Sequence, residues 1–214
     1  MAKTLYSLML SEDVVREVDK LAHRMGTNRS QLINSILAQY VGYVTPEQRI
    51  NEILSQIERL MQPSPELVPF LAPGAMNLSL KSALEYKYRP TVKYDVSLYQ
   101  GGGDPIGEIS VVFRTQSAPL LQTLENFFLT WKQIEDTFYL PKGKRIDYAL
   151  YDGRFTRSIA APSRDTDADT LANVLADYLY LFDGCMKNYI SGRLTTDDMQ
   201  RRYSVFLAKN MLFI

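Results

Sequence analysis

The residues best suited to binding chemistry lie in one short segment, Asn28-Arg29-Ser30-Gln31. Asn28 is a favourable residue for the start of a helix, and Gln31, three residues later, completes a pair that resembles a capping box. The backbone N–H groups of Arg29 and Ser30 would then be free to bind a phosphate oxygen, helped by the helix dipole. Arg29 adds a positive charge and Ser30 adds a hydroxyl group. We interpret the segment as a phosphate anchor; the alternative is that it only caps a helix.

The sequence offers few residues for catalysis or metal binding, because the chain has one histidine, His23, and one cysteine, Cys185. A Ser-His-Asp or Cys-His site would have to use His23, and a zinc site with several His and Cys ligands cannot be assembled. Cys185 cannot form an internal disulfide, and we interpret it as a small buried hydrophobe. The sequence therefore predicts that the protein is not an enzyme and holds no metal or cofactor. Catalysis by carboxylates alone is left open.

An acidic motif, Asp165-Thr166-Asp167-Ala168-Asp169, opens like a calcium-binding loop. Thr170 stands where such a loop needs glycine, and Ala176 stands where it needs glutamate. Without those two residues the loop could neither turn nor close on the ion. We expect the acidic residues to precede a helix, where they interact favourably with its dipole.

The charges are balanced, with 24 Lys and Arg against 24 Asp and Glu. A protein whose only role was to coat nucleic acid would usually be basic. The most basic local cluster is Lys142-Gly143-Lys144-Arg145 with Arg154 and Arg157 on the following hairpin; we favour a solvated loop over a DNA contact for it. Any affinity for DNA must therefore come from where the charges lie.

The length of 214 residues and the hydrophobic content of 46% fit a small domain joined to a medium one. No apolar run approaches the roughly 18 residues of a membrane span, and the N-terminus lacks the apolar region of a signal peptide. With a single cysteine, a reducing, cytoplasmic setting is the simplest expectation, without a membrane partner.

Three short elements would position the phosphate anchor. Residues 3–10 contain no Gly or Pro and predict a strand, and Ser11 begins a helix with apolar residues at three- and four-residue intervals up to Gly26. A second helix extends from Asn28 to about Val41. A unit of this size cannot bury its own apolar residues as a monomer, so the sequence predicts a partner for it.

Residues 45–74 are predicted to be a helix followed by a proline-rich linker. The helix runs from about Pro46 to Met61, and its isoleucines have a spacing that suits either a partner helix or the chain's own domain. Proline recurs so often in residues 62–74 that regular helix or sheet is not expected there. We therefore place the domain boundary in this stretch.

Residues 75–214 predict an α+β domain with antiparallel hairpins and long helices, so the fold class is mainly α plus α+β. Strands are expected at 92–98 and 109–113 and around an Asp-Gly turn at 145–150 and 154–159. Helices are expected from Ser117, from about Asp167 to Ile190 and from Thr195. Many of the 14 tyrosines fall here; we favour core packing over a ligand pocket or a subunit interface.

In the order strand, Ser-Glu helix start, Gly26, polar Arg-Ser turn and apolar helix, residues 3–44 resemble the ribbon-helix-helix family of DNA-binding proteins. The resemblance implies a homodimer in which two strands pair antiparallel as a ribbon that enters the major groove. The four helices would supply the core. The resemblance covers a fifth of the chain and does not extend to residues 45–214.

The register of the ribbon divides its residues into two faces, because the residue before Ser11 should point inward. The inward residues and the apolar face of the helices would form the dimer core: Tyr6, Leu8, Leu10, Val18, Leu21, Ile33, Ile36 and Leu37. The outward residues would face the bases: Lys3, Leu5, Ser7 and Met9. Leu5 and Met9 depart from the family's polar pattern, since they can touch thymine methyl groups but cannot hydrogen-bond to base edges.

The expected function is that of a repressor-like transcriptional regulator that binds double-stranded DNA as a homodimer or tetramer. The C-terminal domain would set the oligomeric state or sense a small-molecule or protein effector. Two alternatives stay open. One is a dimerisation protein without specific DNA readout, and the other is an accessory DNA-binding protein of plasmid transfer or partition.

Overall fold

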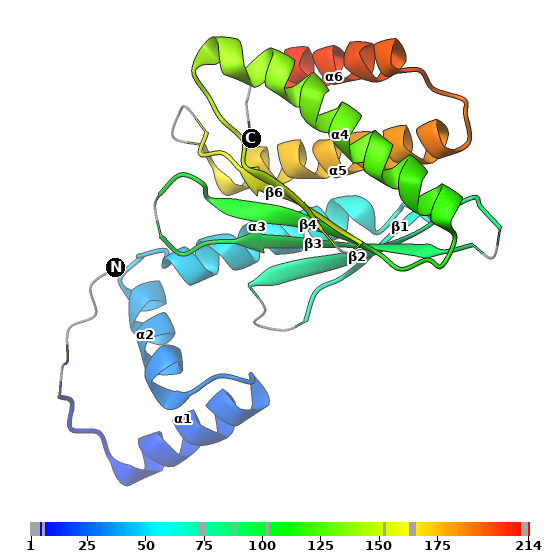
Figure 1. Ribbon diagram of the computed structural model, residues 1–214. Helices are drawn as coiled ribbons and strands as arrows, with labels where there is room; N and C mark the ends of the chain where they lie inside the picture. Colours follow the sequence, from blue (N-terminus) through cyan, green and yellow to red (C-terminus); the bar gives the residue numbers. More distant parts are fainter. Residues whose placement is uncertain are drawn as a thin grey trace.

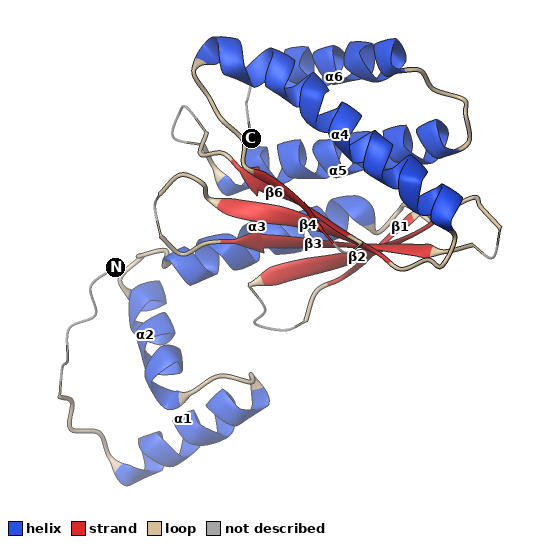
Figure 2. Cartoon of the chain, viewed as in Figure 1, coloured by secondary structure: helices blue, strands red, loops and turns tan. Residues whose placement is uncertain are grey.

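The structure is a computed structural model that describes residues 5, 7–72, 76–87, 89–101, 103–151, 153–162, 166–210 and 214. The described residues form a mixed α/β fold with one antiparallel sheet of six strands (Figures 1 and 2). The helices are α1 (Glu12–Arg24), α2 (Arg29–Tyr40), α3 (Pro46–Met61), α4 (Ala118–Tyr139), the 3-10 helix η1 (Leu140–Lys142), α5 (Ala168–Ile190) and α6 (Thr196–Asn210). The strands are β1 (Leu67–Phe70), β2 (Asn77–Ala83), β3 (Thr91–Leu98), β4 (Gly107–Phe113), β5 (Tyr148–Tyr151) and β6 (Arg154–Ile159).

The sheet has the strand order β1-β2-β3-β4-β6-β5, and each neighbouring pair is antiparallel. Alternate side chains of β2, β3, β4 and β6 are buried, which leaves the other half on a second face. The buried half forms one core with α3, α4 and α5, where Phe182 of α5 packs on Tyr94 and Phe155 of the sheet. Figure 1 shows α4, α5 and α6 above the sheet and the α1–α2 unit below it.

The elements expected after residue 90 are confirmed. Ser117 accepts a hydrogen bond from the backbone of Leu120 at the start of α4. Asp167 caps α5 by accepting one from the N–H of Thr170 at 2.8 Å, as expected for acidic residues before a helix. Asp165, like Asp152 of the expected Asp-Gly turn, lies outside the described residues.

The helix predicted at 46–61 is confirmed as α3, but the proline-rich residues after it differ from the prediction, because they contain a strand of the sheet. Five residues of α3 are buried in the common core: Ile50, Ile53, Leu54, Ile57 and Met61. The proline-rich stretch contains β1, which pairs with β2 at the edge of the sheet. Pro69 fits there because an edge strand pairs on one side only, so the missing N–H of proline is tolerated. Strand β2, which was not predicted from the sequence, lies between β1 and β3.

Two other expectations about single residues are confirmed. Four tyrosines are almost completely buried in the core: Tyr94, Tyr139, Tyr178 and Tyr203. Cys185 is buried on α5, and burial raises the pKa of its thiol to about 11, so the thiolate is disfavoured at neutral pH.

Within the described ranges, no helix has both the length and the apolar character needed to cross a lipid bilayer.

Candidate nucleic-acid interface

The α1–α2 unit consists of two helices joined by a short turn. Gly26 adopts a left-handed conformation, with φ of +64°, where α1 ends, and glycine reaches this conformation without steric cost. The N–H of Thr27 donates to the carbonyl of Ala22 at 2.9 Å, so the chain folds back directly into α2. The side chain of Gln48 in α3 donates to the hydroxyl of Ser35 at 3.4 Å, which joins the unit to the rest of the chain.

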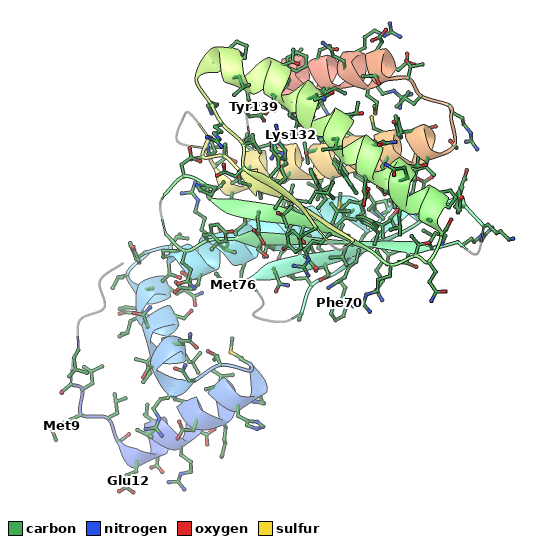
Figure 3. All side chains as sticks on the ribbon, in the orientation of Figure 1. Met9, Glu12, Phe70, Met76, Lys132 and Tyr139 are labelled. Carbon is green, nitrogen blue, oxygen red and sulfur yellow. The ribbon has the colours of Figure 1, made fainter. Side chains whose placement is uncertain are left out.

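The segment before α1 pairs with no other strand among the described residues. Leu5 and Met9 are fully exposed, and Leu8 and Leu10 are about half exposed; none of the described residues before α1 is assigned to a strand. Figure 3 shows Met9 in this segment, well away from the sheet. The predicted ribbon needs a second chain and stays a prediction. The other two residues assigned to it, Lys3 and Tyr6, lie outside the described residues.

Exposed apolar side chains are concentrated in the first 44 residues. Of the 20 large hydrophobic residues that are exposed in the described chain, 12 lie there. We call these residues the apolar surface: Leu5, Leu8, Met9, Leu10, Val14, Met25, Ile36, Leu37, Tyr40, Val41, Tyr43 and Val44. Val18, Leu21 and Ile33 of the predicted dimer core are half-buried. A surface of this kind is typical of sites of protein association, because water contact with so much apolar area is unfavourable.

The predicted phosphate anchor lies at the start of α2. The side chain of Asn28 accepts a hydrogen bond from the N–H of Gln31 at 2.9 Å, and its amide donates to the side chain of Gln31, also at 2.9 Å. The N–H groups of Arg29 and Ser30 donate to no described residue. Unpaired N–H groups of this kind occur at the start of every helix, so the phosphate anchor stays a prediction.

Arg29 is engaged by a residue that was not identified from the sequence. Its guanidinium forms two parallel hydrogen bonds to the carboxylate of Asp19 on α1, at 2.6 and 2.5 Å. The hydrogen bond to Arg29 holds the pKa of Asp19 below its usual value, so the carboxylate stays charged. The two residues are ten positions apart and meet only because α1 and α2 fold back on each other. The sequence alone does not indicate this pair, which becomes apparent only from the way α1 and α2 are arranged in space.

Other cations of the unit are also paired within the chain. Arg16 lies 2.5 Å from the carboxylate of Asp13, and Lys20 lies 2.7 Å from that of Glu17, in each case one helical turn away. These pairs are exposed and contribute little to stability. The free N–H groups at the start of α2 therefore matter more for anion binding than the net charge.

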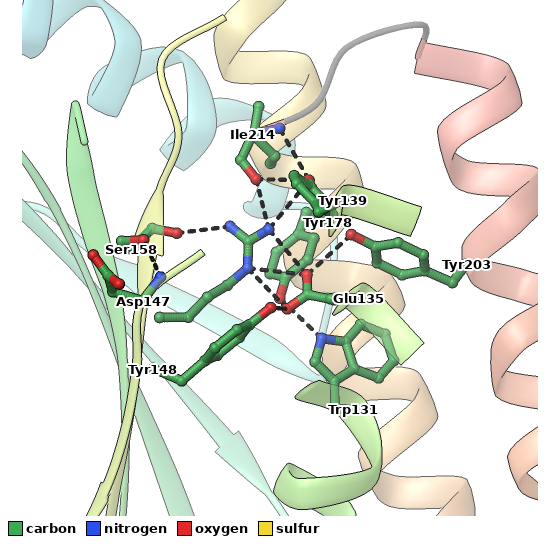
Figure 4. Close-up of polar contacts among 10 residues, drawn as sticks. Trp131, Glu135, Tyr139, Asp147, Tyr148, Ser158, Tyr178, Tyr203 and Ile214 are labelled. Atoms are coloured by element: carbon green, nitrogen blue, oxygen red, sulfur yellow. Dashed lines mark hydrogen bonds and ion pairs between the residues drawn. The ribbon is translucent and has the colours of Figure 1, made fainter. Parts of the chain in front are cut away.

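A second polar cluster lies in the core of the C-terminal domain, around Arg157 and Glu135 (Figure 4). Arg157 is 1% exposed and Glu135 is 0% exposed. The Nε of Arg157 donates to both carboxylate oxygens of Glu135, at 2.9 and 3.1 Å. Its Nη2 donates to the hydroxyl of Tyr139 and to the carbonyl oxygen of Ile214, at 3.3 and 2.5 Å. The assignment of Arg157 to a solvated basic cluster was wrong, because alternation in β6 points its side chain into the core.

Tyrosines complete the cluster. The hydroxyls of Tyr148 and Tyr203 donate to Glu135 at 2.7 and 3.0 Å, and the guanidinium of Arg157 lies 4.6 Å from the centre of the Tyr178 ring. Burial and the negative charge of Glu135 raise the pKa of Tyr148 and Tyr203, so both remain hydrogen-bond donors. Each charge therefore has several partners, and we interpret the cluster as a structural network.

Neither a metal site nor an enclosed ligand cavity emerges elsewhere in the part of the chain that the structure describes. No three His, Cys, Asp or Glu side chains come together there as metal ligands. An open hollow of about 610 Å³ lies between α3 and the start of α5; its lining is polar and includes Asn51, Glu52, Arg59 and Asp169.

Comparison with protein-family models, with curated proteins and with solved structures finds no match to this chain.

Proposed function

We propose that the protein is a non-enzymatic, cytoplasmic transcriptional regulator that binds double-stranded DNA as a ribbon-helix-helix homodimer. The observation that carries the proposal is the apolar surface of the first 44 residues, which one chain leaves open to water. It includes residues of the segment before α1, which forms no strand within one chain and would gain backbone partners from the same segment of a second copy. A second copy of the same unit would satisfy both requirements at once, by pairing the two segments and burying the apolar surface.

The DNA contact in this proposal depends on the start of α2. The free N–H groups of Arg29 and Ser30 supply two donors at the positive end of the helix, and a backbone phosphate supplies the acceptor. Phosphate contacts position a protein on the duplex without reading its sequence. Sequence readout would fall to the ribbon, where Ser7 is the described outward residue with a hydrogen-bonding side chain.

The Arg29–Asp19 pair favours a second candidate, a dimerisation protein that does not read DNA. In this alternative Arg29 joins α1 to α2, and the apolar Leu5 and Met9 face another protein. The C-terminal domain would set the oligomeric state or sense an effector in either case. A role in plasmid transfer or partition would use the same DNA contacts as a repressor.

Two opposite substitutions distinguish DNA binding from dimerisation alone. Arg29→Ala should weaken binding to every duplex several-fold and make it less dependent on salt, because it removes the positive charge beside the phosphate that the backbone N–H groups would hold. Asp19→Asn should strengthen binding, because it releases the guanidinium of Arg29 from its carboxylate partner. Fluorescence anisotropy with labelled genomic duplexes at several salt concentrations measures both effects.

The matched control is the exposed pair on the outer surface of α1, changed in the same way as Arg16→Ala and Asp13→Asn. These variants alter the charge of the same unit by the same amount and should change affinity less than the α2 variants. Equal effects of the two pairs would show that only net charge matters. If the wild-type protein binds no duplex at low salt, the DNA-binding proposal is wrong.

A further inference from the structure

The face of the sheet opposite the helices carries a row of basic residues. Lys81 of β2 lies directly across from Lys93 of β3, Lys93 from Val112 of β4, and Val112 from Arg154 of β6. We call Lys81, Lys93 and Arg154 the basic row. All three side chains are exposed, and each strand places them opposite its buried residues.

The basic row is poorly compensated within the chain. Like charges directly across an antiparallel pair repel, and Lys81 and Lys93 are such a pair. Lys93 has one acidic partner, Asp95, at 2.9 Å. Lys81 and Arg154 form no ion pair with any described residue. The arrangement therefore leaves positive charge available to an external anion.

A buried hydroxyl without a partner lies on the same face, next to the row. Ser110 of β4 is 5% exposed, and its hydroxyl makes no hydrogen bond to any atom of the described chain. Its cross-strand neighbours are Asp95 of β3 and Thr156 of β6, each two residues along its strand from the basic row. A buried hydroxyl normally finds a partner, so Ser110 marks a polar position beneath this face, whereas the neighbouring Thr156 is half-buried and reaches the surface.

The location of the face agrees with that of the candidate nucleic-acid interface. Phe70 pairs with Ser79 and so belongs to the same face of the sheet, and Figure 3 shows it below the sheet. The α1–α2 unit lies on that side as well (Figure 1). Three strand spacings separate Lys81 from Arg154, a span of about 14 Å. DNA offers one phosphate per roughly 3.4 Å of axis on each strand, so a backbone could follow the row over several phosphates.

We propose that this open face of the sheet binds the phosphate backbone of the DNA that flanks the ribbon site. The inference rests on the proposed function, because it takes the flanking duplex as the anion. The basic row supplies the charge, and the hydroxyl of the half-buried Thr156 supplies a hydrogen-bond donor. Such contacts add affinity and salt dependence without adding sequence specificity.

The test compares two duplexes, one limited to the ribbon site and one extended by about 20 base pairs on each side, roughly 70 Å of additional helix axis per side. In the full-length protein, Lys81→Ala, Lys93→Ala and Arg154→Ala together should lower the salt slope on the long duplex by about 2.7 in magnitude. Affinity for the long duplex should fall at least about tenfold at 0.1 M salt. Binding to the short duplex should not change.

The control removes three exposed cations that have acidic partners elsewhere in the chain: Arg145→Ala, Arg193→Ala and Arg201→Ala. This variant has the same net charge as the first and should bind the long duplex like the wild type. The first variant should stay folded, because its substitutions are exposed and remove a repulsive pair; its thermal unfolding checks this.

Three results would overturn the inference. The first is that the basic-row variant has the same salt slope as the wild type on the long duplex. This result is expected if the face binds an acidic protein or a membrane instead of DNA. Another is an equal loss on both duplexes. The third is no binding of wild-type protein to either duplex, which would remove the proposed function as well, whereas the first two leave it intact.

Discussion

Replacing Arg157 with methionine should lower the free energy of unfolding by about 3 to 5 kcal/mol, because it leaves the carboxylate of Glu135 buried without its cation. Glu135 is fully buried and Arg157 almost so, and the guanidinium donates to both carboxylate oxygens. Removing one partner of a buried ion pair destabilises the fold by far more than the intact pair stabilises it, since the remaining charge cannot return to water. Urea denaturation of the full chain measures the loss.

Glu135→Leu is the complementary variant, and it should also destabilise, because it leaves the guanidinium and the hydroxyls of Tyr148 and Tyr203 without their acceptor. The double variant should lose less than the sum of the two single losses, since neither charge remains. Arg145→Met serves as the control: its contact with Asp147 is 3.7 Å long and exposed, so we expect a change within about 0.5 kcal/mol. A comparable, small loss for Arg157→Met would contradict the account of the network.

Replacing Leu37 with aspartate should convert the proposed homodimer to monomers and abolish the proposed DNA binding. Leu37 is 50% exposed in the single chain and belongs to the apolar surface that we assign to the dimer. Burying a leucine side chain contributes about 1.5 to 3 kcal/mol, and each interface contains the residue twice. With a charged side chain in its place, the dissociation constant of the dimer should rise at least about 100-fold. Sedimentation equilibrium over a range of protein concentrations measures this constant.

Leu129→Asp is a closely matched control for Leu37→Asp. Leu129 is 52% exposed on α4, so in a single chain the two leucines have nearly the same contact with water. If exposure in one chain decided the outcome, both substitutions would behave alike. Only dimerisation through the α1–α2 unit predicts that Leu37→Asp dissociates the protein while Leu129→Asp leaves it dimeric. Dimers of equal strength in both variants would place the interface elsewhere.

The sequence predicted the elements whose pattern is local. Alternation located β3, β4 and β6, and capping residues located the starts of α2, α4 and α5. It did not locate β1, because this strand is four residues long, contains Pro69 and depends on pairing with a neighbouring strand. It also did not locate β2, the neighbour with which β1 pairs. The sequence showed the isoleucine stripe of α3, but not what packs against it. Periodicity identifies the apolar face of a helix without identifying the surface on which that face packs, which only the fold shows.

For charged residues too, the sequence indicates which positions are buried but not which residues pair. Glu135 follows Trp131 by four residues on the apolar stripe of α4, and Arg157 stands between Phe155 and Ile159 in the inward register of β6. Two opposite charges at core positions were therefore visible in the sequence as a signal for a buried pair. The Arg29–Asp19 pair had no comparable signal, because it depends on the angle at which α1 and α2 meet. The cap formed by Asn28 and Gln31 was predicted from the sequence, and the pairing of Arg29 with Asp19 was not.

The stoichiometry of the complex with DNA tests the central claim most directly, namely that two copies of the N-terminal unit bind one duplex. Full-length protein should be mixed with genomic duplex from the region flanking its coding sequence, and the mass of the complex measured by analytical ultracentrifugation at low salt. We predict two chains per binding site, or four where two sites are adjacent, and loss of the complex in Leu37→Asp. A single chain bound per duplex, or no complex at any salt concentration, would contradict this claim.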